Sequence, residues 1–303
     1  MPVVVGPGLE FLEKVRSMVD STVKYIFLAQ GQIVEFSYIN KGDGKDIICA
    51  PTQTGCNLKC KFCFLSDYDL VVRNLTPGEI DACVAFVVDD LNLLILPEKN
   101  DVLLISYMGC GEPLLNISEV VEASRRVMRR YHEKYNVVRF AVASLIPRMD
   151  AMLHFIQTVK SVGVPLKFHL SLHFTEDTLR KQMMPGAMPI AESIAAVELF
   201  MHYTGNSAEI HYALIEGVND RAEDILMLIR LLKHRNIPVK FLAYNEKPSL
   251  DFRQSQKIAY FRSVLEAEGI KTEFYLPPGS DIGSSCGQFL MDYYEKYNTK
   301  KKK

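Results

Sequence analysis

A regular alternation of strand-like and helical segments runs from about residue 46 to residue 275 of the 303-residue chain. Strand-like apolar runs recur at Asp46–Ala50, Val102–Met108, Val137–Ala143, Pro165–Leu172, Glu209–Ile215 and Pro238–Ala243. Helical patterns lie between them at about 76–91, 118–131, 149–160, 190–204 and 221–234, and a last helix at about 254–268 precedes a strand at Lys271–Tyr275. Such alternation predicts βαβ units and a parallel sheet. In barrels built this way, the loops after the strand C-termini carry the chemistry.

The segment before this alternation is expected to form a small extension. Residues 8–21 are predicted to form a short amphipathic helix, and two strands follow at Tyr25–Ala29 and Ile33–Ile39. We therefore expect an N-terminal helix and β extension over residues 1–45, a core over 46–296, and a disordered basic tail over 297–303.

Composition bounds the classes of function. A hydrophobic fraction of 48% is ample for a sizeable core, and a net charge of -1 gives no global basic field that would indicate nucleic acid, although a local basic face is compatible with it. No apolar stretch of about 18 residues predicts a membrane span. The N-terminus does not resemble a signal peptide. We therefore expect a cytoplasmic protein whose seven cysteines serve as ligands or catalytic groups rather than structural disulfides.

Three cysteines, Cys56, Cys60 and Cys63, lie within eight residues in a C-x3-C-x2-C pattern. Thiolates hold iron–sulfur clusters. Three of them can bind three irons of a four-iron cluster, which leaves the fourth iron open to a substrate or cofactor. Structural zinc is the alternative, but it is usually closed by four ligands, commonly in two separated pairs. No second pair follows this trio, so the pattern favours a cluster.

A glycine-rich turn, Gly109-Cys110-Gly111-Glu112-Pro113, follows the predicted strand Val102–Met108. Glycine lets the backbone approach a ligand closely. The carboxylate of Glu112 could accept hydrogen bonds from an ammonium group. An ordinary βα turn is the alternative interpretation for this segment alone.

The cysteine trio and the Gly-Glu-Pro turn together resemble the radical S-adenosylmethionine (SAM) enzymes. Further segments narrow the resemblance: Asn74-Leu75-Thr76, Met108–Asn116, Ser171-Leu172-His173, Gly217-Val218-Asn219-Asp220, Tyr244-Asn245 and Asp281–Gln288. In this order they resemble the RNA adenine-methylating class, which contains the dual-specificity ribosomal and transfer RNA adenine carbon-2 methyltransferases and the related carbon-8 resistance methyltransferase. The similarity runs from about Tyr25 to the C-terminal helix. It implies an α/β fold with a partial (β/α)6 parallel barrel of the radical SAM type and a small N-terminal β extension.

The resemblance also assigns ligands. It implies that Cys56, Cys60 and Cys63 bind a [4Fe-4S] cluster, and that SAM is bound by Gly111, Glu112, Ser144, Ser171, Leu172, His173 and Asn245. The chain is about two residues shorter than the family pattern between Arg139 and Pro147, the stretch that contains Ser144. A histidine such as His173 would more often be a satisfied core residue, and its place in Ser-Leu-His favours the functional interpretation.

Two isolated cysteines carry the implied chemistry. By resemblance, Cys286 takes a methyl group from one SAM, and a second SAM supplies a 5′-deoxyadenosyl radical that removes hydrogen from this S-methyl group. The carbon radical adds to adenine, Glu35 removes the ring proton, and Cys49 resolves the protein–RNA adduct through a transient disulfide. One extra residue separates Glu35 from Cys49 relative to the family. Taken alone, either cysteine would be read as buried and inert, as we read Cys83 and Cys110.

The resemblance implies a ribosomal or transfer RNA substrate, an electron donor such as flavodoxin or ferredoxin, and a monomer. It favours carbon 2 over carbon 8 as the target, although no residue of the sequence separates the two. Family members carry a helical N-terminal accessory domain, whereas only about thirty residues precede the barrel-like part here. Two alternatives therefore stay open: the same two-cysteine chemistry on a non-RNA substrate, and an inactive module that binds a cluster or zinc. The joint presence of Cys49, Cys286 and Glu35 argues against the inactive module.

Overall fold

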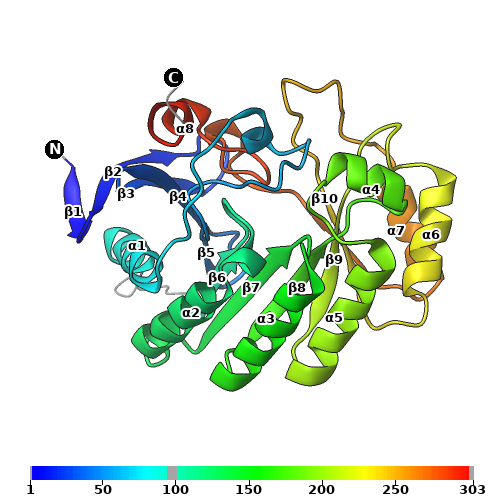
Figure 1. Ribbon diagram of the computed structural model, residues 1–303, viewed down its shortest axis with the longest axis horizontal. Helices are drawn as coiled ribbons and strands as arrows, with labels where there is room; N and C mark the ends of the chain where they lie inside the picture. The colour runs from blue at the N-terminus through cyan, green and yellow to red at the C-terminus, as the bar shows by residue number, and fades with distance from the viewer. Residues whose placement is uncertain (1, 94–100, 300–303) are drawn as a thin grey trace.

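The computed structural model describes residues 2–93 and 101–299, and its eleven strands form one sheet in the order β1 to β11. The extension contributes β1 (Val3–Gly6), β2 (Leu9–Arg16), β3 (Val23–Ala29) and β4 (Gln32–Ile39). The core contributes β5 (Lys45–Cys49), β6 (Val102–Tyr107), β7 (Val137–Ser144), β8 (Leu166–Ser171), β9 (Ala208–Ala213), β10 (Val239–Leu242) and β11 (Thr272–Tyr275). Figure 1 shows the sheet curving around an interior with helices on its outer face.

The core strands β5 to β11 all pair in parallel, whereas β1 to β5 pair antiparallel. The intervening helices are α1 (Pro77–Asp90), α2 (Ile117–Tyr131), α3 (Met149–Val162), α4 (Asp177–Met183), α5 (Ile190–Thr204), α6 (Ala222–Leu232) and α7 (Ile258–Ala267), and α8 (Met291–Tyr297) follows β11. The end strands β1 and β11 do not pair with each other, so the sheet is not closed. The predicted partial parallel barrel with a β extension is confirmed, with β11 as a seventh parallel strand.

Alternation along the parallel strands separates a helix-facing core from a polar interior. On β8, Phe168 packs against Phe155 of α3 and Phe200 of α5, with ring centroids 6.0 and 5.3 Å apart. The neighbouring positions Lys167 and His169 line the interior cavity instead. Because side chains alternate across a strand, each core strand presents apolar groups outward to its helices and another set inward.

The predicted helix over residues 8–21 is wrong, because this segment contains strand β2. It pairs antiparallel with β3, and a register irregularity lies between Phe11 and Glu13. The Phe11 ring packs 4.6 Å from Phe86 of α1 and 5.7 Å from Phe27 of β3. The apolar spacing of this segment is compatible with a helix, but pairing with the free edge of β3 decides the outcome, as tertiary context commonly does.

The predicted disorder of the tail does not hold at its beginning. The Asn298 side chain is completely buried, and its Nδ2 donates to the carbonyls of Ile33 (3.0 Å) and Thr54 (2.6 Å). The backbone N–H of Ile33 donates back to Asn298 Oδ1 at 2.7 Å. Residues 300–303 of the predicted tail lie outside the described residues.

Among residues 2–93 and 101–299, no helix has both the length and the apolar character that crossing a membrane requires.

Candidate active site

One cavity of about 770 Å³ occupies the interior of the open barrel. It brings together predicted site residues that are far apart in the sequence: Glu35, Cys49, Ser171, His173, Asn245 and Cys286. The other predicted residues do not line this cavity: Cys56, Cys60, Cys63, Gly111, Glu112, Ser144 and Leu172. Phe62 of the cysteine loop does line it, so the cysteine loop borders the same space.

The cysteine trio forms a tight loop beyond β5. Lys59 adopts a left-handed backbone (φ 53°), and the Cys63 N–H donates to the Cys60 carbonyl at 3.0 Å. The three thiols are free and partly buried, and burial raises the pKa of Cys56 to about 12 and that of Cys63 to about 11. A bound metal would remove these protons, because coordinated thiols ionise outright.

The three sulfurs do not converge as a single-ion site would. Sulfurs bound to one zinc at about 2.3 Å in a tetrahedral site would lie about 4 Å apart. Among the described residues, the group of three side chains whose ligand atoms lie close enough together to hold one metal ion is His169, Glu209 and His211, and the cysteine trio is not such a group. This arrangement fits a cluster, in which each thiolate binds a different iron.

The glycine-rich turn packs tightly against the segment after β5. Gly111 has φ 103°, and a Cβ there would approach the Gln53 backbone nitrogen to 2.8 Å, so no other residue fits without a shift. The Glu112 N–H donates to Gln53 Oε1 at 2.9 Å, and its carboxylate accepts from the Leu114 N–H at 3.1 Å. Burial raises the pKa of Glu112 to about 7, while a hydrogen bond from Ser144 opposes that rise. A cationic ligand would favour the ionised carboxylate.

His173 is held as a neutral imidazole in a defined orientation. It adopts φ 54°, and its Nδ1 accepts from the Ala213 N–H at 3.0 Å. Burial, and then the nearby His211 and Arg180, lower its pKa to about 3. The neutral ring therefore carries its proton on Nε2. The Phe62 ring contacts it edge-on, 5.3 Å between centroids, which joins the cysteine loop to the end of β8.

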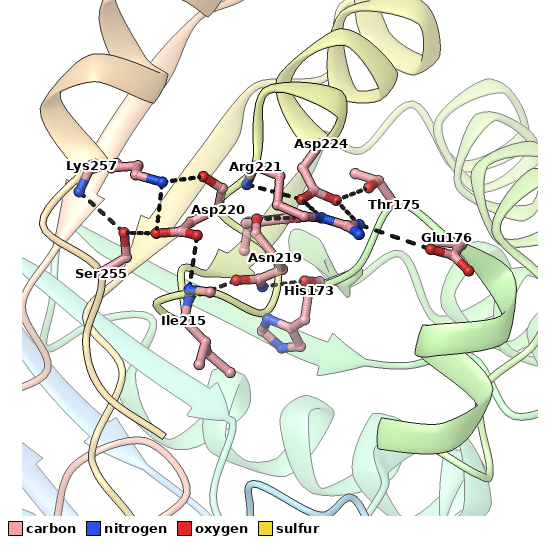
Figure 2. Close-up of polar contacts among 12 residues, drawn as sticks. His173, Thr175, Glu176, Ile215, Asn219, Asp220, Arg221, Asp224, Ser255 and Lys257 are labelled. Carbon is pink, nitrogen blue, oxygen red and sulfur yellow. Dashed lines mark hydrogen bonds and ion pairs between the residues drawn. The ribbon is translucent and has the colours of Figure 1, made fainter. Parts of the chain in front are cut away.

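Asn219 gives the Gly-Val-Asn-Asp segment a structural role, which the sequence did not predict. Its Nδ2 donates to the carbonyls of His173 and Ala213, both at 2.7 Å, and its Oδ1 accepts from the Ile215 N–H at 2.6 Å. Figure 2 shows Asn219 lying between His173 and Ile215. A single buried amide thus joins the ends of β8 and β9.

Arg180 of α4 is a functional neighbour that the sequence did not indicate. Its side chain is almost completely buried, and its guanidinium donates to the carbonyls of Ser171 (2.9 Å), Leu172 and Leu145 (3.1 Å). It therefore fixes the backbone of the Ser-Leu-His segment. An arginine on a short amphipathic helix carries no signal in one sequence that it turns inward.

Cys49 and Cys286 face the same cavity. Cys49 ends β5, between Ser37 of β4 and Ser106 of β6, and Cys286 lies in the loop before α8, where its side chain is exposed to solvent. The pKa of Cys49 is raised to about 12, first by burial and then by the charge of Cys286. All seven cysteines are free thiols, so the described chain contains no disulfide.

Glu35 is buried and its carboxylate is fully engaged. Oε2 pairs with Lys24 Nζ at 2.8 Å, and Oε1 accepts from the Leu290 N–H at 3.0 Å. The predicted base therefore lines the cavity, and it is also bound to the segment that carries Cys286.

A charged cluster around Glu209 contributes Lys167, His169, His211 and Lys240 to the lining of the cavity. Glu209 Oε1 lies 2.8 Å from His169 Nδ1, 3.4 Å from His211 Nε2 and 2.6 Å from Lys240 Nζ, and Lys167 pairs with the other oxygen. The two ammonium groups already neutralise the carboxylate, which opposes cation binding between the histidines. No motif in the sequence predicted this cluster; its only signal was polar side chains at alternate positions of buried strands.

Comparison with known proteins agrees with this geometry. A profile of the Radical SAM superfamily matches residues 50–232. The chain is 34% identical to a probable dual-specificity RNA methyltransferase RlmN of Symbiobacterium thermophilum, over 92% of this chain and 75% of that protein. It is 28% identical to the protein of the same name from Carboxydothermus hydrogenoformans, over 95% and 82% of the two chains. A crystal structure of a radical SAM methyltransferase from Sphaerobacter thermophilus superposes with a TM-score of 0.79 at 28% identity, covering 93% and 81% of the two chains.

Proposed function

Because this chain belongs to the radical SAM superfamily and, within it, to the RlmN dual-specificity RNA methyltransferases, we propose that it methylates a ring carbon of adenine in RNA through Cys286 and Cys49. The observation that carries the proposal is that both cysteines open onto one cavity together with Ser171, His173 and Asn245. Cleavage of SAM to a radical would by itself need only the cysteine loop and the residues that bind SAM. It would not need two further thiols facing the same space.

The chain's residues fit the two cofactors. Cys56, Cys60 and Cys63 would hold a [4Fe-4S] cluster, which with bound SAM supplies a strongly oxidising 5′-deoxyadenosyl radical. Glu112 would accept hydrogen bonds from the SAM amino group, because its buried carboxylate accepts from backbone N–H groups and has no cationic partner within residues 2–93 and 101–299. Ser171, His173 and Asn245 would contact the rest of the molecule from the cavity wall.

Cys286 would act as the methyl carrier. Its sulfur would take the methyl group of one SAM, which would leave as S-adenosylhomocysteine while the thiol loses its proton. A second SAM, with one electron from the donor, would be consumed for the removal of one hydrogen atom from the S-methyl group. Its exposed position within the cavity suits this role, because both SAM and the adenine of the substrate must reach the Cys286 side chain.

Glu35 and Cys49 would complete the reaction. Glu35 would accept the ring proton from the adduct between the methylene carbon and adenine, and the unpaired electron of this adduct would leave to a one-electron acceptor, a role that a bound cluster could fill. Cys49, as a thiolate, would then attack the Cys286 sulfur and form a transient Cys49–Cys286 disulfide. The electron pair of the broken carbon–sulfur bond would go to the methylene carbon, which takes up a proton and becomes the methyl group. Two electrons from a dithiol reductant would restore the thiols.

The names of the relatives support an RNA substrate. We propose ribosomal and transfer RNA as the substrates and carbon 2 of adenine as the target, as the sequence resemblance implies. We further propose a monomer in the cytoplasm that is reduced by flavodoxin or ferredoxin. The decisive test is mass spectrometry of ribosomal and transfer RNA after incubation with anaerobically reconstituted enzyme, SAM and a reductant. We expect a new methyladenine with the wild type and with the core variant Cys83→Ala, and none with Cys286→Ala. Unmodified RNA with active SAM cleavage would contradict the RNA assignment.

A further inference from the structure

The loop from Gly283 to Leu290 carries Cys286 and is tied at both ends to the β extension. At its start, Lys24 Nζ donates to the Gly283 carbonyl, and Ser284 Oγ lies 2.5 Å from Ser37 Oγ. At its end, the Leu290 N–H donates to Glu35 Oε1 at 3.0 Å. The residues that hold the loop therefore come from β3 and β4.

The Lys24–Glu35 pair links these two attachments. Its atoms lie 2.8 Å apart, and the side chains are 2% and 4% exposed. Removing two charges from water costs free energy that their attraction often fails to recover, so a buried ion pair is weak evidence for stability. The other hydrogen bonds of the two side chains are more informative. Lys24 donates to one end of the loop, at Gly283, and Glu35 accepts from the other end, at Leu290.

The loop has little regular structure of its own. Gly283 and Gly287 both have positive φ, 61° and 77°. On the opposite side, the Gly287 carbonyl accepts from the Phe64 N–H at 3.0 Å and the Cys286 carbonyl accepts from Asn245 Nδ2 at 2.9 Å. Hydrogen bonds from neighbouring segments, rather than a strand or a helix, thus fix the position of Cys286.

We propose that Lys24 is a positioning residue: with Glu35 it clamps both ends of the 283–290 loop and so holds Cys286 in the cavity that it shares with Cys49. The proposal rests on the proposed function in one respect, that Cys286 is the methyl carrier. Lys24 contacts the proposed base, Glu35, but within the described chain it donates no hydrogen bond to either cysteine. It acts through the Gly283 carbonyl and through the Glu35 carboxylate.

The test compares hydrogen exchange in three folded proteins. Lys24→Met alone would leave the Glu35 carboxylate buried and unpaired, so the main variant is Lys24→Met/Glu35→Gln. In this double variant both charges are absent, and the introduced amide oxygen can still accept from the Leu290 N–H. The matched control is Lys14→Met, which removes the more exposed Lys14–Asp90 ion pair of the neighbouring strand β2. Exchange is read by mass spectrometry on peptides covering residues 283–290 and the core strands.

We expect exchange in 283–290 to accelerate about tenfold or more in the double variant, with the core strands and the control unchanged. Unchanged exchange in this loop, or equal acceleration throughout the core, would overturn the clamp.

A second readout separates positioning from mere attachment. The fraction of Cys286 that carries a methyl group is measured in protein isolated from cells, before any step that needs Glu35 as a base. We expect this fraction to fall at least several-fold in the double variant and to stay at the wild-type level in Lys14→Met. A freed loop with undiminished methylation would overturn the positioning role. A wild type without S-methylcysteine would instead refute the proposed function, and the exchange result would still decide whether the clamp exists.

Discussion

The side-chain amide of Asn245 donates to the backbone carbonyl of Cys286 at 2.9 Å, so a predicted SAM-binding residue directly contacts the segment of the predicted methyl carrier. The two residues come from the loop after β10 and from the loop before α8. The same loop of Cys286 also accepts a hydrogen bond from the cysteine loop, through Phe64. Neighbouring backbone contacts therefore join the segment of Cys286 to a predicted SAM-binding residue and to the cysteine loop.

Replacing Cys56, Cys60 or Cys63 by Ala should abolish cluster binding, because each thiolate would hold a separate iron. Anaerobically reconstituted wild type should be brown, with about four irons per chain by metal analysis, whereas each variant should be nearly colourless. Cys83→Ala, in the core far from the loop in sequence, should load normally. Stoichiometric zinc with no iron in the reconstituted wild type would contradict this expectation.

Asn219→Ala should destabilise the protein and weaken SAM binding. The change leaves the His173 and Ala213 carbonyls without the amide that joins them, and unsatisfied buried groups cost about 1–3 kcal/mol each. Urea unfolding measures the stability, and equilibrium dialysis of the loaded enzyme measures SAM affinity. Asn136→Ala, which removes an exposed hydrogen bond to Asp101, is the control and should change neither. Wild-type SAM affinity in Asn219→Ala would show that this amide does not organise the site.

Glu112 should make stability depend on pH. Its pKa rises from 4.5 to about 7 in the folded protein, so between these values the native state binds the proton more tightly than the unfolded state does. The contribution to the free energy of unfolding is fully present below pH 4.5 and is lost as pH rises through about 7.

The full difference is on the order of 3 kcal/mol. Glu112→Gln, a neutral isostere, should remove this part of the pH dependence. The test is the difference in unfolding free energy between the two proteins from about pH 4.5 to about pH 8, and a constant difference would refute the assignment.

Local signals in the sequence predicted much of this structure. The helical pattern at about 76–91 predicted α1, which begins after Thr76 with the reciprocal hydrogen bonds of a capping box between Thr76 and Glu79. The prediction of a helix around β2 failed because the apolar spacing of this segment suits a helix as well as a strand. Its pairing with β3 and its contact with Phe86 determine that it forms a strand.

The residues of the candidate site also fall into those that local sequence motifs predicted and those that they did not. Residues in recognisable motifs, such as Cys286 and His173, were predicted to be functional and do line the cavity. Lys24 and Arg180 were not predicted, because their roles depend on burial and on backbone partners that only the fold brings close. Lys24 donates to the carbonyl of Gly283, and Arg180 donates to the carbonyl of Leu172. A charged residue that turns inward looks like a surface residue until its partners are in place.

Cys49→Ala should trap the reaction at a covalent stage. The variant retains Cys286 and Glu35, so methyl transfer and addition to the substrate should proceed, but no thiol remains to attack the Cys286 sulfur. We expect a protein–RNA adduct, detected as an RNase-resistant mass increase on the peptide spanning Cys286, and its attached nucleotide should be adenosine. Cys286→Ala/Cys49→Ala is the matched control and should form no adduct. Because the pKa of Cys49 is raised to about 12, resolution in the wild type should accelerate with pH in single-turnover measurements, as the thiolate fraction grows. Normal turnover by Cys49→Ala would refute the two-cysteine mechanism for this chain.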